Sequence, residues 1–439
     1  MEKLISISDL RVGMFVRART VSDRREGGAR HYLEIVNGFS IGKTNRRARL
    51  TGRMHQTVEQ NGGLLVSSEH QIERLRETGL AMLTIDTDKG TDLGYMEMPL
   101  TDPVRRPPPP GRLVHFDEEL SRAQEARSVA TDTLRVSLEN VAAGRELDVA
   151  SITRAGTVIS ESILRNVDAM VSLIRLKEHD AYSAMHSMNV CTLVTAMALH
   201  GGASAADLPI VAGAALLHDV GKTRIPLEIL NKPGRFEPHE MAEMRQHAIH
   251  SGDIMRETGG FTAESVAIAT QHHEMMDGSG YPLGLEGDAV HPYARLSAVA
   301  DVYDALTAKR VYKPAMPMYQ ALLRIHRDKG SRFDEQAVDL FIRTLGLYPV
   351  GSLVQLNSKE RAVVYQPNPR NSRKPTVSIY TLPNRRSRGA PLIVNLAVRS
   401  EAEGRTIESV LDPEREGVDV EGIIRETERR GEHTERRRR

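Results

Sequence analysis

The chain is poor in several residue types that define large classes of proteins. Of its 439 residues, one is cysteine (Cys191), none is tryptophan, and aromatic residues make up 4%. A single cysteine excludes an intramolecular disulfide and a metal site built from thiolates, and it suits a reducing compartment. So few rings argue against a stacking platform for single-stranded nucleic acid. Charge of one sign is also lacking: the net charge is +1, which argues against binding polyanions by charge alone.

Long apolar runs are absent as well. No stretch approaches the ~20 apolar residues that cross a bilayer, and the first sixteen residues carry Asp9 and Arg11 where a signal peptide needs an apolar stretch. We therefore expect a cytoplasmic protein with no membrane span and no nucleic-acid partner. With 40% hydrophobic residues the chain can form cores, and its length suggests about three folded units at roughly 150 residues each.

Composition divides the chain into parts. Residues 1–104 mix short β-type runs, at 14–16 and 81–85, with one helical pattern over 69–80, which predicts a small α+β domain. Residues 105–111 contain four consecutive prolines, which cannot donate backbone hydrogen bonds and favour an extended, semi-rigid linker.

The remainder is mainly helical and then β-rich. Helices are expected within 112–348, over 116–143, 151–175, 178–200, 207–219, 237–258, 262–273, 293–309, 317–327 and 334–345. Ser151, Asp207 and Asp334 are the expected helix starts. Runs rich in β-branched residues predict a β-rich segment over 349–400, and the charged residues 401–439 are expected to be a disordered tail. The predicted fold class is multi-domain and mainly α, with the α+β domain before the helices and the β-rich segment after them.

The pair His218–Asp219 is the most informative feature. It ends the helix expected over 207–219, which is apolar on every side and should be buried. Polar groups at such depth are costly unless they are paired or bound to a metal. Taken alone, the two residues also fit a hydrogen-bonded pair without a ligand.

Other segments carry similar groups into apolar surroundings. His186 lies in a helical pattern without Asp, Glu, Lys or Arg, and His272 and His273 are adjacent. Asp301 and Asp304 are three residues apart, which places both carboxylates on one helix face. Imidazoles and carboxylates without thiolate suit Mn, Fe or Zn, and helical bundles build such sites from facing helices.

These motifs, in this order, closely resemble the HD-GYP family of all-helical, metal-dependent phosphodiesterases that act on the bacterial second messenger cyclic di-GMP (c-di-GMP). The motifs are His218-Asp219 with Gly221-Lys222, Lys232-Pro233-Gly234, His272-His273-Glu274, Asp277 to Pro282, and Asp301 to Asp304 with Arg310 and Lys313. The resemblance spans about residues 165–350 and implies an HD-type helical bundle over 112–348. Residues 7–16 and 85–90 look like a small domain of unknown role that often precedes it.

The resemblance implies a dinuclear site with two divalent transition-metal ions, Fe or Mn. The implied metal ligands are His186, His218, Asp219, His247, His272, His273 and Asp301, with Asp219 shared between the metals. The implied catalytic residues are Asp219 and Lys222. The implied substrate contacts are Lys222, Asp304, Arg310, Lys313, Gly280, Tyr281 and Pro282. Two cations suit this chemistry because they generate a nucleophile and neutralise phosphate oxygens, and the charge of Lys222 can act on the phosphate.

Two positions depart from the family pattern. Tyr182 stands where members with a third metal have Glu, so two metals are expected. Ser251 stands where Gly is usual, four residues after His247, which weakens the assignment of His247. His250 lies on the same helix face as His247 and is interpreted as a non-ligand.

The expected function is hydrolysis of c-di-GMP by a metal-activated hydroxide to pGpG, with GMP as a further product left open. The alternatives are a catalytically silent c-di-GMP receptor or scaffold, and an HD-type hydrolase of another nucleotide. The intact set of ligands argues against the first, and the block from His272 to Pro282 argues against the second. Partners other than c-di-GMP are diguanylate cyclases or other signalling proteins bound through Gly280-Tyr281-Pro282. The metal identity and the oligomeric state, a homodimer included, stay open.

Overall fold

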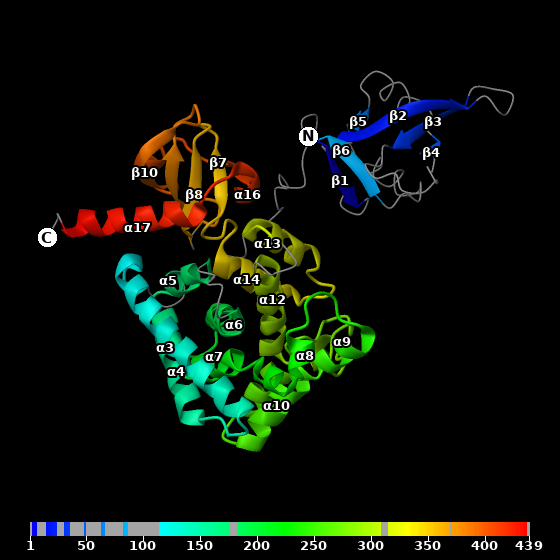
Figure 1. Ribbon diagram of the computed structural model, residues 1–439. Helices are drawn as coiled ribbons and strands as arrows, with labels where there is room; N and C mark the ends of the chain where they lie inside the picture. The colour runs from blue at the N-terminus through cyan, green and yellow to red at the C-terminus, as the bar shows by residue number, and fades with distance from the viewer. Residues whose placement is uncertain are drawn as a thin grey trace. The chain divides into compact units, whose positions relative to one another are not determined.

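The computed structural model describes residues 114–175, 182–308, 315–368 and 371–436, together with six strands before residue 87. The chain divides into two compact units, residues 1–99 and 100–439. In the first unit the strands form an antiparallel sheet in the order β1-β6-β2-β3-β4, with β5 paired to β2 (Figure 1). They are β1 (Glu2–Ser6), β2 (Phe15–Asp23), β3 (Arg30–Ile35), β4 (Ala48–Arg49), β5 (Gly63–Leu65) and β6 (Met82–Asp86). The helix expected over 69–80 and the linker over 105–111 lie outside the described residues.

Helices fill the second unit as far as residue 345. They are α3 (Phe116–Ala142), α4 (Val149–Arg165), α5 (Val167–Ser172), α6 (Tyr182–His200), α7 (Leu208–Leu216), α8 (Leu227–Leu230), α9 (Pro238–Arg245), α10 (His247–Thr258), α11 (Ala263–Gln271), α12 (Pro292–Thr307), α13 (Met318–Arg327) and α14 (Glu335–Leu345). Short 3₁₀ turns are η3 (Leu173–Arg175), η4 (Val220–Arg224) and η5 (Gly287–Ala289). The mainly helical prediction for this region is confirmed.

The prediction of one helix over 151–175 is wrong in two respects. The helix begins earlier, because Asp148, not Ser151, is the N-cap, and its carboxylate accepts the N–H of Ser151. The helix also breaks at Asn166, which is extended and whose side chain accepts the N–H groups of Asp168 and Ala169 at the start of α5. An Asn that caps the next helix competes with continuation of the first.

The expected helix over 237–258 is likewise two helices, α9 and α10, that meet at Gln246. Asp334 is confirmed as a cap, since its carboxylate accepts the N–H of Ala337. Asp207 does precede α7, but its side chain makes no cap hydrogen bond to that helix.

The burial predicted for α7 is confirmed. Most of its side chains are buried, with Ala215 and Leu216 fully so, and it packs against α4, α6 and α11. His218 and Asp219, which come just after α7 in the chain, therefore lie next to the core of the helical unit. Among the described residues, no helix combines the length and the apolar character that a membrane span requires.

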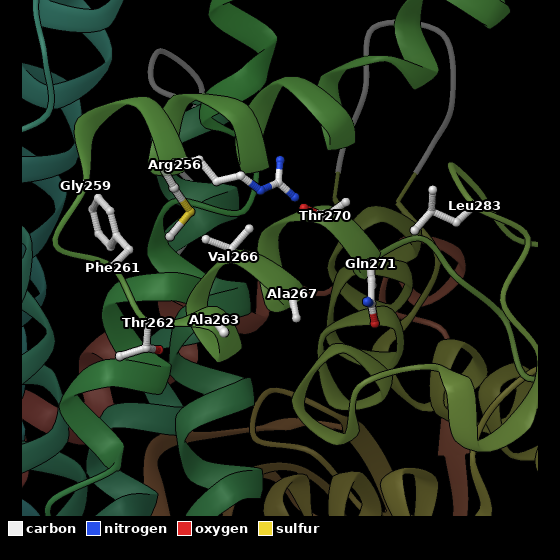
Figure 2. Close-up of a pocket in the computed structure, with 11 residues that line it drawn as sticks. Arg256, Gly259, Phe261, Thr262, Ala263, Val266, Ala267, Thr270, Gln271 and Leu283 are labelled. Carbon is white, nitrogen blue, oxygen red and sulfur yellow. The ribbon is translucent and has the colours of Figure 1, made fainter.

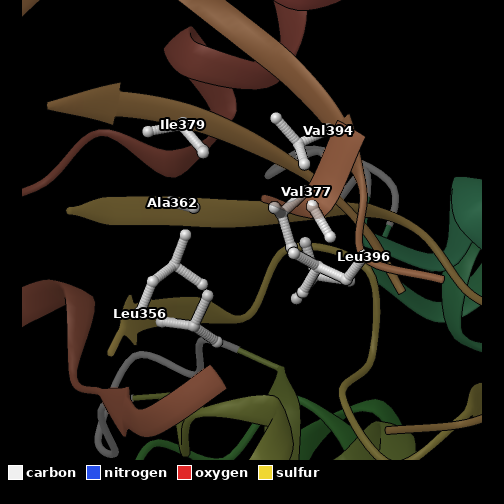
Figure 3. Packing of buried hydrophobic residues seen from close by; sticks show 9 residues of the cluster. Leu356, Ala362, Val377, Ile379, Val394 and Leu396 are labelled. Atoms are coloured by element: carbon white, nitrogen blue, oxygen red, sulfur yellow. The ribbon is translucent and has the colours of Figure 1, made fainter. Parts of the chain in front are cut away.

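An antiparallel sheet follows the helices, in the order β10-β9-β8-β7-β11. Its strands are β7 (Leu353–Leu356), β8 (Arg361–Gln366), β9 (Thr376–Thr381), β10 (Ser387–Asn395) and β11 (Ile407–Leu411). Because side chains alternate along a strand, Val377 and Ile379 of β9 join one apolar cluster (Figure 3). Between them, the Ser378 hydroxyl bonds that of Thr427 in α17 (Val420–Arg436).

The expectation of a disordered tail over 401–439 is wrong for residues 401–436. Strand β11 completes the sheet by pairing with β7, α15 (Arg399–Ala402) and α16 (Pro413–Glu416) flank β11, and α17 packs on β8, β9 and β10. High charge misled the prediction, because the few apolar residues of the segment are placed on one face: Ile424, for example, is fully buried. Strong amphipathicity lets a charged helix fold against a sheet.

Candidate metal centre

Seven side chains converge on one buried site in the helical unit. They are His186 from α6, His218 and Asp219 from the turn after α7, His247 from the start of α10, His272 and His273 from the turn after α11, and Asp301 from α12. Three overlapping groups of these residues have potential ligand atoms within 4.8 Å of one another. The residues predicted as ligands from the sequence are thus all brought together in space.

Three of the histidines are oriented by the same local device. The Nδ1 atom of each lies close to the backbone carbonyl three residues earlier: His218 to Ala215 at 2.8 Å, His247 to Met244 at 2.6 Å and His272 to Ala269 at 2.7 Å. Each histidine follows the end of a helix by one or two residues, where the last carbonyls have no intrahelical partner. The imidazole N–H satisfies one of them, so Nδ1 carries the proton and Nε2 presents its lone pair.

Those lone pairs face one another inside the site. Nε2 of His247 lies 3.3 Å from Nε2 of His272 and 3.2 Å from Nε2 of His273. Because the Nδ1 contacts make Nε2 of His247 and of His272 acceptors, these two atoms cannot hydrogen-bond to each other. In addition, Nε2 of His218 and Oδ1 of Asp219 are buried without a hydrogen-bond partner among the described residues. Converging acceptors of this kind fit a cation.

Asp219 stands between two groups of ligands. Its Oδ1 atom lies 3.4 Å from Nε2 of His247 and 3.8 Å from Nε2 of His272. Its Oδ2 atom lies 3.4 Å from Nε2 of His218 and 3.5 Å from Nε2 of His186. One carboxylate therefore offers one oxygen to each group. Asp301 also reaches two histidines, with Oδ1 3.1 Å from His186 and Oδ2 3.3 Å from His273.

Electrostatics separates the two groups of imidazoles. Burial lowers the pKa of His247 and of His272, and it lowers the pKa of His273 to about 3, so these three are neutral ligands at neutral pH. Burial also acts to lower the pKa of His186, but hydrogen bonds to Asp301 and Asp304 outweigh it and raise that pKa to about 9. Burial acts to raise the pKa of Asp219, yet the nearby charge of Lys222 above all holds it well below its usual range. The carboxylate is therefore ionised.

Asp304, which was predicted as a substrate contact, lies against His186. It is buried behind His186, where Oδ2 accepts from Nδ1 of His186 at 2.8 Å and Oδ1 accepts from Nδ2 of Asn189 at 2.8 Å. A carboxylate on the far nitrogen of a metal-ligating imidazole orients the ring and raises its basicity. Asp304 is thus placed to orient His186, and its role as a substrate contact stays a prediction. Asn189 was missed, although its spacing of three from His186 places both on one helix face.

Ser251, which stands where glycine is usual in the family, helps to hold α10 and thus His247 in place. The Ser251 hydroxyl accepts the N–H of Gly221 at 2.8 Å, which ties α10 to the turn that follows Asp219. A Cβ atom at Gly221 would lie 2.1 Å from the carbonyl oxygen of His247, so only glycine permits this approach. The close contact of η4 with α10 brings His247 within reach of Asp219.

Glu274 holds the loop that contains Gly280, Tyr281 and Pro282. Its buried carboxylate accepts the backbone N–H groups of Leu283 and Leu285 at 2.6 and 3.1 Å. Sequence reasoning included Glu274 in a motif but gave it no role. The loop is thereby held close to the converging histidines, with the Tyr281 ring beside that of His273.

Tyr281 and Arg245 extend the site outward. The Tyr281 ring lies over that of His273, with centroids 4.5 Å apart. Arg245 is exposed, and its guanidinium carbon lies 5.0 Å from the centroid of the Tyr281 ring, which is a cation–π contact. Arg245 was not among the predicted site residues, and its signal is its position two residues before His247. It places positive charge next to the ligand cluster.

The remaining predicted residues divide into two kinds. Lys222 lies at the site, where its ammonium donates to Oδ2 of Asp219 at 2.5 Å. Arg310 and Lys313 lie outside the described residues.

A separate hollow of about 570 Å³ lies between the end of α10, α11 and Leu283 (Figure 2). Its lining includes Arg256, Phe261 and Val266 but none of the seven converging residues, so it is not the metal centre.

Comparison with known proteins places these residues in context. Residues 169–337 match the family described as HD domain. The chain is 34% identical over 328 residues to a cyclic di-GMP phosphodiesterase of Pseudomonas aeruginosa, which covers 73% of this chain and 78% of that protein. It is 47% identical over 137 residues to a probable cyclic di-GMP phosphodiesterase of Vibrio cholerae (29% of this chain, 31% of that protein). A 3'3'-cGAMP-specific phosphodiesterase of the same organism is 34% identical over 168 residues (38% and 36%).

Proposed function

The chain belongs to the HD-GYP family of HD-domain phosphodiesterases and is a hydrolase, and we propose that it hydrolyses the phosphodiester bonds of c-di-GMP at a site for two divalent metal ions. The observation that carries the proposal is the placement of Asp219, whose two oxygens face two separate groups of imidazoles. The similarity to the P. aeruginosa enzyme over most of both chains supports c-di-GMP as the substrate.

The residues present fit two metals. His247, His272 and His273 with Oδ1 of Asp219 would hold one ion. The second ion would be held by His186, His218 and Asp301 with Oδ2 of Asp219. Nitrogen and oxygen ligands without thiolate suit Mn, Fe or Zn, and of these Mn or Fe is proposed from the family resemblance. When bound, two such cations supply a nucleophile at neutral pH and neutralise the charge of a phosphodiester.

The protein's own groups supply the rest. The contacts of Nδ1 with backbone carbonyls keep His218, His247 and His272 in the tautomer that a metal ligand requires. The Lys222 ammonium is partly exposed and close to Asp219, so it can reach a phosphate oxygen of a bound substrate. A positioned cation of this kind stabilises the charge that develops in phosphoryl transfer.

The proposal is tested with purified full-length protein loaded with Mn²⁺ or, anaerobically, Fe²⁺. The protein is incubated with c-di-GMP and, in parallel, with 3'3'-cGAMP, and the nucleotides are resolved by chromatography. We expect pGpG from c-di-GMP at a higher kcat/KM than any product from cGAMP. Tight binding of c-di-GMP without turnover would identify a receptor instead, and a preference for cGAMP would identify a different nucleotide specificity.

Replacing Arg245 with alanine is expected to raise the KM for c-di-GMP about tenfold and to change kcat little. The guanidinium lies over the Tyr281 ring, beside the ligand cluster, so it should contribute to binding of an anionic substrate in ground and transition state alike. A charge-assisted hydrogen bond contributes ~1.5–3 kcal/mol, and 1.4 kcal/mol corresponds to about tenfold. Arg256→Ala, which removes a surface cation paired with Asp253, is the control. An Arg245→Ala enzyme with unchanged KM would remove Arg245 from the binding site.

A fragment that begins at Gly111 is expected to bind metal and to hydrolyse c-di-GMP at a rate close to that of the full chain. The seven converging residues all belong to the second compact unit, whereas residues 1–99 form the first. The comparison measures metal stoichiometry, thermal melting and turnover of both proteins. A soluble, metal-loaded but inactive fragment would show that the first unit completes the active site.

A protein partner at the Gly280-Tyr281-Pro282 loop also belongs to this proposal. Glu274 holds the loop in place, and the adjacent Leu283 side chain is well exposed. An ordered loop with an exposed apolar residue suits contact with a signalling protein such as a diguanylate cyclase.

A further inference from the structure

Arg127 is a buried cation that lies outside the segment matching the HD family. It is on α3, at a position 42 residues before the start of the match at residue 169, and only 6% of its surface is exposed. Its Nη2 atom donates to Oδ1 of Asn189 at 2.7 Å. A buried charge is costly unless it is hydrogen-bonded. An arginine at this position therefore suggests a role that an apolar residue could not fill.

The contact fixes the direction of a chain of hydrogen bonds. An arginine side chain can only donate, so the atom of Asn189 that meets Arg127 must be the amide oxygen. The amide nitrogen then faces Oδ1 of Asp304, 2.8 Å away, and donates to it. This assignment removes the usual ambiguity between the oxygen and the nitrogen of an asparagine amide.

The chain of hydrogen bonds ends at a residue assigned to the metal site. With both oxygens acting as acceptors, the Asp304 carboxylate accepts a hydrogen bond from His186 Nδ1 through Oδ2 at 2.8 Å. The other nitrogen of His186 is then left for the site, 3.1 Å from Asp301 and 3.5 Å from Asp219. Arg127 thus sets the orientation of the Asn189 amide, and the Asp304 carboxylate, which can only accept, continues the chain of contacts to His186.

Helix α3 is well placed for such a role. It packs against α6, which carries His186 and Asn189, and against η4, which follows Asp219. At its first residue, the Phe116 ring meets Tyr365 of β8 edge to face. The helix therefore joins the surroundings of the metal site to the C-terminal sheet.

We propose that Arg127 is a positioning residue for metal binding, which acts through Asn189 and Asp304 to fix the orientation and tautomer of His186. The inference rests on the proposed function only in requiring that the site bind a divalent cation. It extends the functional unit beyond the HD segment to α3. Partners of metal ligands typically change metal affinity 10- to 100-fold when they are lost, and Arg127 lies two links further out.

The experiment titrates metal-free full-length protein with Mn²⁺ by calorimetry and compares wild type with Arg127→Met, which keeps the apolar stem but cannot donate. We expect the Kd of the weakened site to rise about tenfold. The matched control is Arg135→Met on the same helix, where an exposed arginine pairs with Glu139. That variant should bind Mn²⁺ as the wild type does.

A conservative variant and a double-mutant cycle separate positioning from stability. Arg127→Lys keeps a donor and should recover part of the Mn²⁺ affinity, and it serves as the test if Arg127→Met does not fold. In the background of Asp304→Asn, the Arg127→Met substitution should cost little further affinity, because the two residues act through one chain of contacts. Unchanged Mn²⁺ affinity in Arg127→Met, or losses that simply add in the double variant, would overturn the inference.

The same titration distinguishes this inference from the proposed function. If wild type binds Mn²⁺ but does not hydrolyse c-di-GMP, the proposed function fails while the role of Arg127 is still decided by the Kd values. If wild type hydrolyses c-di-GMP and Arg127→Met has the wild-type Kd, only the inference fails. If wild type binds no divalent metal, both fail.

Discussion

Asp219→Ala is expected to abolish hydrolysis of c-di-GMP and to reduce binding at both proposed metal positions. One carboxylate serves both groups of imidazoles, with contacts of 3.4 Å from Oδ1 to His247 and from Oδ2 to His218. Its loss therefore removes a ligand from each ion at once. Because loss of a single transition-state donor already costs ~10²–10³ in rate, we expect a loss on the order of 10³-fold or more.

The measurement combines turnover with metal content by elemental analysis. The fold should survive, because the Asp219 side chain makes no capping hydrogen bond to η4 and its Oδ1 atom has no hydrogen-bond partner among the described residues. Helicity by circular dichroism should accordingly stay close to that of wild type. Asp339→Ala, which removes a surface carboxylate paired with Lys329, is the control. An Asp219→Ala protein that keeps two metals and near-normal turnover would show that the carboxylate bridges nothing.

The cluster of candidate ligands could be predicted from the sequence because its members belong to recognisable motifs. His218–Asp219 and His272–His273 are adjacent pairs, and Asp301 lies on an apolar helix. Polar pairs in apolar surroundings need a reason, and several such pairs in one region indicate a common site. The seven predicted ligands accordingly lie together, although the number of ions they hold is a proposal.

What orients the ligands could not be predicted, because it depends on where helices end. The carbonyls of Ala215, Met244 and Ala269 orient three imidazoles, and any residue type offers a carbonyl. Helix ends are also the least certain part of a sequence-based prediction, as the break at Asn166 shows. A histidine can bond the backbone carbonyl three residues earlier only where that carbonyl lies in the last turn of a helix. The sequence therefore becomes informative only when the residue that ends the helix is known.

Asp304 shows a second limit. Spacing correctly placed it on the same helix face as Asp301, but it could not tell which side of His186 each carboxylate takes. Asp301 contacts Nε2 and Asp304 contacts Nδ1 of the same ring. The difference between a ligand and a positioning residue is thus a few ångströms across one imidazole. Arg127 leaves no trace in any local motif, since it lies on α3, whereas Asn189 shares a helix face with His186 on α6 and Asp304 lies on α12.

The C-terminal residues illustrate the opposite error. Charge is high throughout 401–436, yet β11 pairs with β7 and α17 covers the sheet. Composition measures the average of a segment, whereas folding of a surface element depends on whether its few apolar residues share one face. Ile424, which is fully buried, and Thr427, which bonds Ser378, are the residues that a composition count overlooks.

Lys222→Ala is expected to lower kcat by a factor on the order of 10²–10³, as for the loss of one transition-state donor, while metal binding is kept. The ammonium donates to Oδ2 of Asp219, the same atom that faces His218 and His186. A metal ion that binds the metal-free protein must therefore compete with the lysine for this oxygen. Removing the lysine should leave the Mn²⁺ affinity unchanged or increase it, which is the reverse of what loss of a structural residue would do.

The test pairs kcat at saturating Mn²⁺ with the Kd for Mn²⁺ of the metal-free protein. Lys329→Ala removes a lysine that pairs with Asp339 away from the site, and it should change neither quantity. Lys222→Arg keeps the charge and should recover part of the rate, since the guanidinium can also donate to phosphate oxygens. A weaker Mn²⁺ affinity in Lys222→Ala, with kcat near wild type once metal is saturating, would make the lysine a support for Asp219. A lower kcat with intact affinity assigns its charge to the phosphate, because the ammonium then acts after the metal site has already been filled.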